Sequence, residues 1–235
     1  RFSLVNTDDV DGRFSPIDRL SPTTRLRPID VPLFTAVDEM NSWRIVRPGI
    51  SNRFFTKRSG QTYEWLAINN YMDVYLEDPE FDRNSSNFFT DVQWRPLPWL
   101  TASTTAQVPL FDEMLEFSEI TSALAFMPTD WFRFGLRHYY LNDHPFFQDS
   151  SLVSLSTYTR LGDNWGFSTS HRFEQDDSTL EYQQYSIHRD LASWTASLGT
   201  MIRDNRQDTN EFGILFSLTL KAFPRSSLPV DFQPG

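Results

Sequence analysis

Cysteine is absent from the 235 residues, so the chain can form neither a disulfide framework nor a thiolate metal site. Long apolar runs are absent as well. The longest uncharged stretch, residues 96–111, is polar and interrupted by proline, which excludes a membrane-spanning helix of about 20 apolar residues. A membrane protein would therefore have to be a β-barrel. The net charge of -10 opposes binding to a phosphate backbone, and we expect no nucleic-acid partner.

Catalytic and metal-binding motifs are missing too. The four histidines have no H-x-x-x-H or H-E-x-x-H spacing, and the chain contains no G-x-S-x-G or G-x-G-x-x-G motif. We therefore expect no bound metal, no cofactor and no enzymatic activity. One alternative stays open, because a hydrolase can assemble its site from separate strands, for example from His138 or His171 with a nearby Ser or Asp.

The chain does contain regular alternation of apolar and polar residues after residue 42, without the i, i+3, i+4 spacing of an amphipathic helix. In the last such segment the apolar positions are Phe212, Ile214, Phe216, Leu218 and Leu220. An all-β fold is therefore expected, with strands at 43–57, 61–76, 87–96, 99–109, 114–127, 130–141, 151–161, 164–174, 178–189, 191–203 and 210–223.

The connections between these strands alternate between two kinds. Short turns lie at 57–61, 95–98, 128–130, 161–164 and 189–192, and longer or more polar loops lie between them. A tryptophan follows each short turn, at Trp65, Trp99, Trp131, Trp165 and Trp194. Because Trp is favoured where an apolar slab meets water, these residues are expected to form an aromatic girdle at one rim.

Strands of ten or more residues with one apolar and one polar face fit a barrel wall that crosses a bilayer at a tilt. A soluble sandwich shows the same alternation, with its apolar face against a second sheet. Strand length, the two kinds of connection and the Trp level favour an antiparallel transmembrane β-barrel, built as an up-and-down meander. Its polar, lumen-facing side chains are expected to include Arg133, Arg137, Ser193, Thr195, Ser197 and Arg203.

The two arginines of the strand at 130–141, Arg133 and Arg137, allow two interpretations. Guanidinium groups suit the phosphate of a passing lipid. Alternatively, they pair with carboxylates of neighbouring strands or of a plug, since charges in such positions are normally paired.

Outer-membrane barrels place short turns in the periplasm and long loops outside. This rule predicts an extracellular loop or irregular segment at 1–42, transmembrane strands over 43–223 and a periplasmic tail at 224–235. Eleven strands are an odd number, whereas single-chain bacterial barrels close with even numbers. Either residues 31–37 supply another strand, or the chain is the C-terminal part of a larger barrel, which we favour.

Four segments resemble, in their order and spacing, the C-terminal half of the LptD family, the lipopolysaccharide-assembly translocons of the bacterial outer membrane. They are VDEMNSWRIVRPGISNRFFTKRSG (37–60), FFTDVQWRPLPWLTASTTAQ (88–107), YQQYSIHRDLASWTASLG (182–199) and EFGILFSLTLKAFP (211–224). The likeness spans about 37–224. The family often carries cysteines near 189–194, and this chain has none.

The resemblance implies a very large barrel that follows a periplasmic jelly roll and is plugged by an LptE-like lipoprotein, with a periplasmic bridge protein as a further partner. Lipopolysaccharide would cross the lumen and leave sideways into the bilayer, between the first and last strands. The last strand would then form one side of the lateral seam, through Glu211, Phe212, Gly213, Ile214, Phe216, Ser217, Leu218, Thr219 and Lys221.

The expected function is thus a lipopolysaccharide translocon of the bacterial outer membrane that performs no covalent chemistry. Two alternatives remain: a self-contained porin-like or structural barrel, and an outer-membrane hydrolase.

Overall fold

The computed structural model describes residues 2–5, 43–77, 83–111, 117–144, 147–204, 210–222 and 227–232. Every regular element in these ranges is a β-strand, which confirms the expected all-β fold. Among these residues there is no helix of the length and apolarity that a membrane span needs. The possible strand at 31–37 lies outside the described residues.

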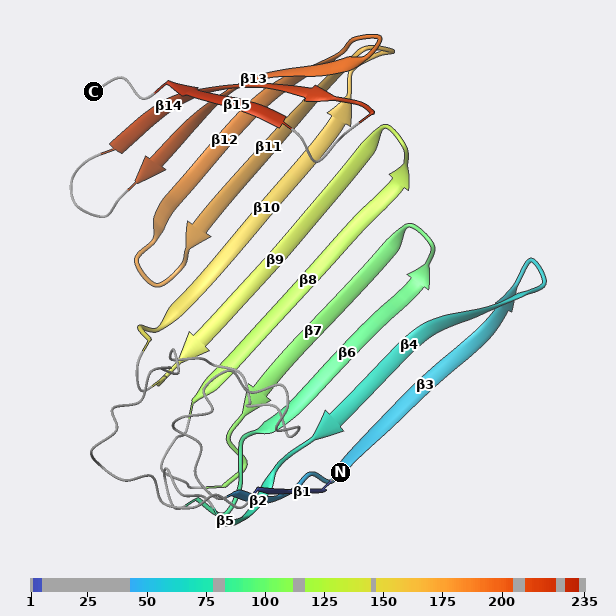
Figure 1. The fold of residues 1–235 in the computed structure, drawn as a ribbon, viewed down its shortest axis with the longest axis vertical. Coiled ribbons are helices and arrows are strands. Elements are labelled where there is room, and N and C mark those ends of the chain that lie inside the picture. Colours follow the sequence, from blue (N-terminus) through green and yellow to red (C-terminus); the bar gives the residue numbers. More distant parts are fainter. Residues whose placement is uncertain are drawn as a thin grey trace. The chain divides into compact units, whose positions relative to one another are not determined.

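Twelve strands form one sheet in which neighbours in the sheet are successive long strands of the chain, so the expected antiparallel meander is confirmed (Figure 1). They follow the order β3 (Gly49–Arg58), β4 (Gln61–Tyr71), β6 (Phe88–Leu97), β7 (Leu100–Val108), β8 (Ser118–Thr129), β9 (Phe132–Asn142), β10 (Ser150–Arg160), β11 (Trp165–Glu174), β12 (Thr179–Asp190), β13 (Trp194–Asp204), β14 (Asn210–Leu220) and β15 (Ser227–Phe232).

A second, three-stranded sheet consists of β1 (Phe2–Val5), β2 (Trp43–Val46) and β5 (Val74–Glu77). Its presence corrects two expected strands, 43–57 and 61–76, which are each divided in two. The first is interrupted at Pro48, whose missing N–H cannot join a ladder. The second is interrupted at Met72 and Asp73, and Asp73 turns its carboxylate to Arg47.

The chain divides into two compact units. Unit 1 comprises residues 1–92, 104–120 and 141–149, and unit 2 comprises residues 93–103, 121–140 and 150–235. Unit 1 contains the small sheet and the hairpin β3–β4. Unit 2 contains β10 to β15 whole, and β6 to β9 contribute residues to both units.

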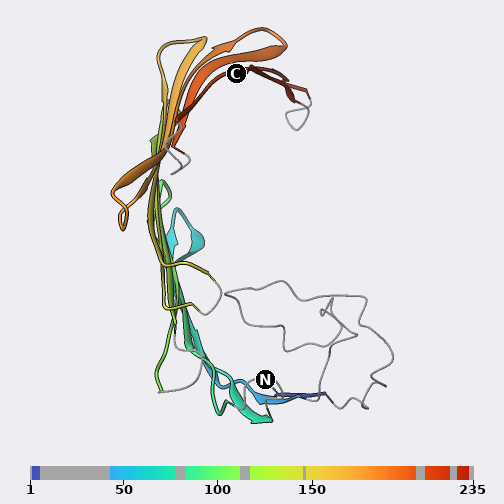
Figure 2. The ribbon, with the colours of Figure 1, turned by 90° about the vertical axis from the view of Figure 1, so that its left-hand side faces the viewer.

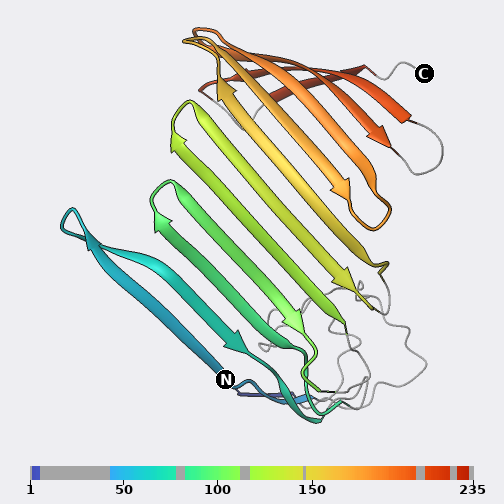
Figure 3. The same cartoon turned by 180° about the vertical axis from the view of Figure 1, so that it is seen from behind.

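The short connections are tight turns with the expected chemistry. Ser59 and Gly60 join β3 to β4 and both have positive φ, 47° and 80°, as a two-residue type I′ turn requires. The short turns that lie in unit 2 are all at one end of the sheet, and the connection from β11 to β12 lies at the opposite end (Figures 1 and 3). This arrangement agrees with the alternation of connections in the sequence.

The end of the sheet differs from the expectation. The last strand was expected to run to residue 223 and a tail to follow; β14 instead ends at Leu220, and residues 227–232 of that tail form β15. β15 pairs antiparallel with β14, from Ile214 opposite Phe232 to Thr219 opposite Ser227. The tail therefore contributes the final strand of the sheet.

Candidate functional site

One face of the unit 2 sheet is mostly apolar. In an antiparallel pair, residues directly opposite each other point to the same face, and the register places Phe167, Ile187, Leu198 and Phe216 in one row across β11 to β14. Ile187 is 49% exposed, Leu198 57% and Phe216 37%. Large apolar side chains in a continuous row are thus accessible on this face. All the described strands of unit 2 belong to one sheet, seen as a single layer in Figure 2.

The opposite face of the same strands is polar. The residues adjacent in sequence to this row point to the polar face: Ser168 on β11, His188 on β12 and Ser197 on β13. The His188 ring joins the other two, with Nε2 2.8 Å from Ser168 Oγ and Nδ1 2.7 Å from Ser197 Oγ. Tyr182 continues this polar face by donating its hydroxyl to Gln184 Oε1 at 2.5 Å.

Several glycines lie on the polar face, close to atoms of the neighbouring strands. A Cβ on Gly166 would lie 2.7 Å from the Tyr158 hydroxyl, and a Cβ on Gly135 would lie 2.7 Å from Ser156 Oγ. A Cβ on Gly199 would lie 2.7 Å from the carbonyl oxygen of Tyr185. At Gly199 a backbone atom of the neighbouring strand occupies the space of a side chain, so this position requires glycine, whereas at Gly135 and Gly166 a neighbouring side chain would have to move.

Arg133 and Arg137 lie on this polar face, because they alternate with Phe132 and Phe134 and share the side of Gly135 that meets Ser156. The Arg133 guanidinium carbon is 5.8 Å from the ring centroid of Tyr158. Both arginines are exposed, and neither forms an ion pair with a carboxylate among the described residues. The interpretation in which neighbouring strands neutralise them therefore has no support in the described part of the chain.

The remaining expected lumen residues occupy different positions. Ser197 binds His188 as described above, and Thr195 donates its hydroxyl to Asp190 Oδ1 at 3.3 Å. Arg203 is exposed opposite Glu211. Ser193 lies in the turn before β13, where its carbonyl accepts a hydrogen bond from the Lys221 N–H at 3.0 Å.

Among the described residues, more polar than apolar side chains are buried, the reverse of what a soluble domain shows. The buried apolar residues among those described are Ala67, Tyr75, Phe89, Ala106 and Leu141. The buried polar residues are more numerous: Asp73, Ser85, Ser86, Gln107, His144, Ser151, Glu174 and Ser186. Soluble proteins bury mainly large aliphatic and aromatic side chains, whereas here most of these are half-buried or exposed.

Four of the five expected girdle tryptophans share a position at the short turns. Trp99 and Trp131 are turn residues, and Trp165 and Trp194 begin β11 and β13. All four are exposed, at 36% to 54%. Trp65 differs, since it is the fifth residue of β4 and packs 6.0 Å from the ring of Phe54. The girdle role itself stays a prediction.

The expected seam strand corresponds to β14, and Lys221 follows it in a turn. Its apolar-face residues Phe212, Ile214 and Phe216 are exposed, at 48%, 41% and 37%. The other expected residues of the strand are Glu211, which is exposed, Gly213, which is buried, and the half-buried Ser217, Leu218 and Thr219. Lys221 Nζ lies 2.7 Å from Asp190 Oδ1 and ties this end of β14 to β12.

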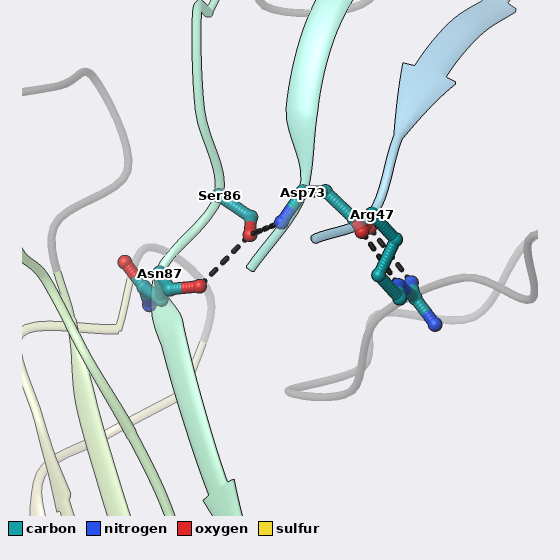
Figure 4. Close-up of polar contacts among 4 residues, drawn as sticks. All are labelled: Arg47, Asp73, Ser86 and Asn87. Atoms are coloured by element: carbon teal, nitrogen blue, oxygen red, sulfur yellow. Dashed lines mark hydrogen bonds and ion pairs between the residues drawn. The ribbon is translucent and has the colours of Figure 1, made fainter. Parts of the chain in front are cut away.

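A polar cluster in unit 1 was not anticipated from the sequence. Arg47 binds Asp73 through two bonds, Nε to Oδ1 at 2.6 Å and Nη2 to Oδ2 at 2.7 Å (Figure 4). Ser86 Oγ accepts the Asp73 N–H at 2.8 Å and donates to the Asn87 carbonyl at 2.8 Å. The hydrogen bonds to Asp73 raise the pKa of the Arg47 guanidinium above its ordinary value.

This cluster connects the small sheet to the large one within unit 1. The Arg47 guanidinium also lies over the ring of Tyr71, 5.1 Å from its centroid, and Tyr71 stacks on Phe89 at 5.1 Å. The only sequence signal was the pair of interruptions that Pro48 and Asp73 make in otherwise regular strands. All of its charges are matched, so the arrangement holds backbone segments together and is not an open ligand site.

One serine–histidine pair bears on the hydrolase alternative. His138 Nε2 lies 3.1 Å from Ser151 Oγ. Ser151 is 7% exposed, and its hydroxyl donates to Gln175 Oε1 at 2.8 Å. The Glu174 carboxylate accepts from the Ser151 N–H at 2.6 Å. Among the described residues, therefore, no acid is bonded to the His138 ring to orient it as a catalytic imidazole.

His171 does not join a catalytic set either. Its Nε2 lies 3.0 Å from the Tyr185 hydroxyl, which donates to Gln183 Oε1 at 3.2 Å. No group of three or more His, Cys, Asp or Glu residues in the described ranges is arranged to hold a metal ion. No family model and no curated protein matches the chain in sequence comparisons.

Proposed function

We propose that this chain forms part of the wall of a transmembrane β-barrel in the bacterial outer membrane, and that the barrel is a lipopolysaccharide translocon of the LptD kind. The observation that carries the first part is the row of the half-buried Phe167 and the exposed Ile187, Leu198 and Phe216 on one face, with serines and His188 on the other. A wall between lipid and a wet lumen needs this distribution.

A soluble sheet with the same row would have to cover it. Burying such side chains is worth roughly 1.5–3 kcal/mol each, and contiguous apolar patches left in water mark a surface for a membrane or a partner. In the proposed barrel the acyl chains of the bilayer cover the row. The strands of 10 to 12 residues in unit 2 are long enough to cross the hydrocarbon at a tilt.

The substrate is inferred from the resemblance to the LptD family, supported by the chemistry of the polar face. Arg133 and Arg137 have no carboxylate partner in the described part of the chain, and their guanidinium forks suit phosphate groups. Ser168, Ser197 and His188 add hydroxyl and imidazole groups suited to a sugar. A phosphorylated glycolipid matches this surface better than a neutral solute does.

The wall requires further strands, because β3 and β15 end the strand order of the sheet. In the proposed translocon these strands belong to a larger barrel, and an LptE-like lipoprotein plugs the lumen. A periplasmic bridge protein delivers the lipid. The chain itself performs no covalent step.

The test uses photocrosslinking in cells that express the full-length protein. A photoreactive amino acid replaces Arg133 or Arg137 on the polar face. The control replaces Arg189, which shares the face of Trp165 at the short-turn end of β12 and lies 4.8 Å over its ring. In the proposed orientation this end meets the inner leaflet.

We expect the polar-face positions to capture lipopolysaccharide and Arg189 to capture phospholipid. Capture at Arg133 and Arg137 should cease when lipopolysaccharide synthesis is stopped. A porin-like barrel would yield no lipopolysaccharide adduct at these positions but would conduct ions across a planar bilayer. Recovery of the protein without detergent would contradict the membrane location itself.

A further inference from the structure

The tail strand β15 occupies the edge of β14, the strand that ends the barrel meander in the proposed translocon. Its register covers six consecutive positions, from Ile214 opposite Phe232 to Thr219 opposite Ser227. Exposed strand edges attract other strands because their N–H and C=O groups are unpaired. The position of β15 therefore decides what else can reach β14.

The direction of each backbone group of β14 follows from one bond. The Lys221 N–H donates to the Ser193 carbonyl at 3.0 Å, and these residues continue the β13–β14 register in which Trp194 faces Leu220. In an antiparallel ladder, alternate residues direct both backbone groups to alternate edges. The odd-numbered residues of β14 thus bond to β13, and the even-numbered residues Ile214, Phe216 and Leu218 direct their N–H and C=O groups to β15.

Pro229 fits this geometry in a particular way. It lies opposite Ser217, an odd-numbered residue, so the pair belongs to the non-hydrogen-bonded type and the Pro229 nitrogen faces away from β14. Its missing N–H costs nothing in the β14–β15 ladder. It does remove a donor from the outer edge of β15, where proline is a known obstacle to further strand addition.

We propose that residues 227–232 are a detachable cover for the outer edge of β14. While they are paired, β14 is closed to any other strand, and the outer edge of β15 is a poor substitute because of Pro229. For a strand or a lipid to reach β14, the tail must first leave. The part that concerns lipid rests on the proposed function, whereas the pairing of the tail does not.

The tail can detach from β14 because its pairing with that strand is short. Its described register contains three pairs of the hydrogen-bonded type, at Ile214, Phe216 and Leu218, and short terminal segments are the parts of a fold that open at the lowest free energy. By contrast, β13 and β14 pair over eleven positions, from Trp194 opposite Leu220 to Asp204 opposite Asn210. Detachment of the tail therefore leaves the rest of the sheet intact.

Hydrogen exchange at single-residue resolution tests the pairing. In the full-length protein in lipid, deletion of the tail after Ala222 should accelerate exchange of the Ile214, Phe216 and Leu218 amides by about tenfold or more. The Leu215, Ser217 and Thr219 amides, which bond to β13, should keep their protection. If the even-numbered amides stay protected after the deletion, another strand occupies the edge and the proposal is wrong.

Disulfide trapping gives a second, independent measurement in a chain that has no cysteine of its own. Leu215→Cys with Asp231→Cys places two cysteines at a non-hydrogen-bonded pair, the closest type of cross-strand neighbour. Ser217→Cys with Asp231→Cys is the control, two residues out of register. The first pair should oxidise readily and the control should not; equal oxidation of both, or none in either, would overturn the register.

The Leu215→Cys/Asp231→Cys variant also tests the functional part. Locking the tail should stop the appearance of new lipopolysaccharide at the cell surface, and dithiothreitol should restore it. A locked tail with normal export would refute the cover while leaving the translocon proposal untouched. Absence of any export dependence on the full-length protein would instead reject the translocon, and the pairing of the tail would still stand on the exchange data.

Discussion

Leu198 of β13 and Phe216 of β14 lie directly opposite each other on one face of the sheet, and both side chains are exposed, at 57% and 37%. Their neighbours along the chain, Ser197 and Ser217, form the corresponding pair on the other face. In the proposed barrel, these two adjacent cross-strand pairs of opposite polarity face two different environments, lipid and the lumen. The chemistry that each environment tolerates can therefore be tested residue by residue.

If the proposed barrel is correct, replacing Leu198 by arginine should destabilise the protein in phospholipid vesicles by about 2–4 kcal/mol, because the charge would enter the hydrocarbon near the middle of a strand of 11 residues. Ser217→Arg is the matched control. It places the same side chain on the polar face of the adjacent strand, where a change within about 0.5 kcal/mol is expected. Urea unfolding followed by tryptophan fluorescence measures both. Equal losses for the two variants would mean that the faces do not meet different solvents.

Gly199 should be the least replaceable glycine of unit 2. An alanine Cβ there would lie 2.7 Å from the backbone carbonyl oxygen of Tyr185 and would also collide with Ser186 Oγ. Because the backbone must move, we expect Gly199→Ala to cost about 1–3 kcal/mol. Gly213→Ala is the control, since its Cβ would meet only the flexible end of Met201 at 3.3 Å. The same urea titration should find Gly213→Ala within about 0.5 kcal/mol of the wild type.

Most of the sheet could be predicted from the sequence because the alternation and the turn chemistry are local. The strand at 178–189, for example, corresponds to β12 (Thr179–Asp190). The interruption at Pro48 is a local signal that the prediction of one strand over 43–57 overlooked. The interruption at Asp73 could not be placed in advance, because it depends on a contact with Arg47, which is 26 residues away. β15 was missed for a different reason: residues 227–232 do alternate, with Leu228, Val230 and Phe232 at every second position, but Pro229 counts against a strand, and the pairing comes from the edge of β14.

The candidate site, too, could be predicted from the sequence only where local features decide it. Face assignments for Arg133, Arg137 and Ser197 need only the two-residue period of a strand. The bridging of Ser168 and Ser197 by His188, and the absence of a carboxylate beside the arginines in the described ranges, depend on register between strands. Register is set by pairing and not by the pattern of a single strand.

The ion pair of Arg47 and Asp73 should contribute more to stability than a surface pair does. The side chains are 21% and 3% exposed, so Asp73→Asn leaves a partly buried guanidinium without its counter-charge. We expect a loss of about 3 kcal/mol, at the low end for a buried pair because Arg47 keeps some contact with solvent. Glu64→Gln breaks the exposed pair with Arg53, 57% and 23% exposed, and should cost less than about 1 kcal/mol. Urea unfolding in detergent micelles measures both variants.

The pH dependence of this pair follows from the raised pKa of Arg47. A cation whose pKa is raised on folding stabilises fully below its unfolded pKa, and the contribution is lost only as pH rises through the folded value. Since both values lie at or above the ordinary arginine range, the stability difference between wild type and Asp73→Asn should stay constant from about pH 7 to about pH 10. A difference that shrinks within this window would mean that another titrating group sets the contribution.

Ser151 should be inert as a nucleophile although His138 lies 3.1 Å away. Its hydroxyl proton is directed to Gln175 Oε1, so the imidazole Nε2 must act as the donor in the His138–Ser151 contact, the reverse of a general base. The Glu174 carboxylate binds the Ser151 N–H and the Ser150 hydroxyl, at 2.6 and 2.7 Å, and neither bond orients His138. A fluorophosphonate probe should therefore give the same labelling of the full-length wild type and of Ser151→Ala. Labelling that disappears in both Ser151→Ala and His138→Ala would establish a hydrolase in place of the inert pair.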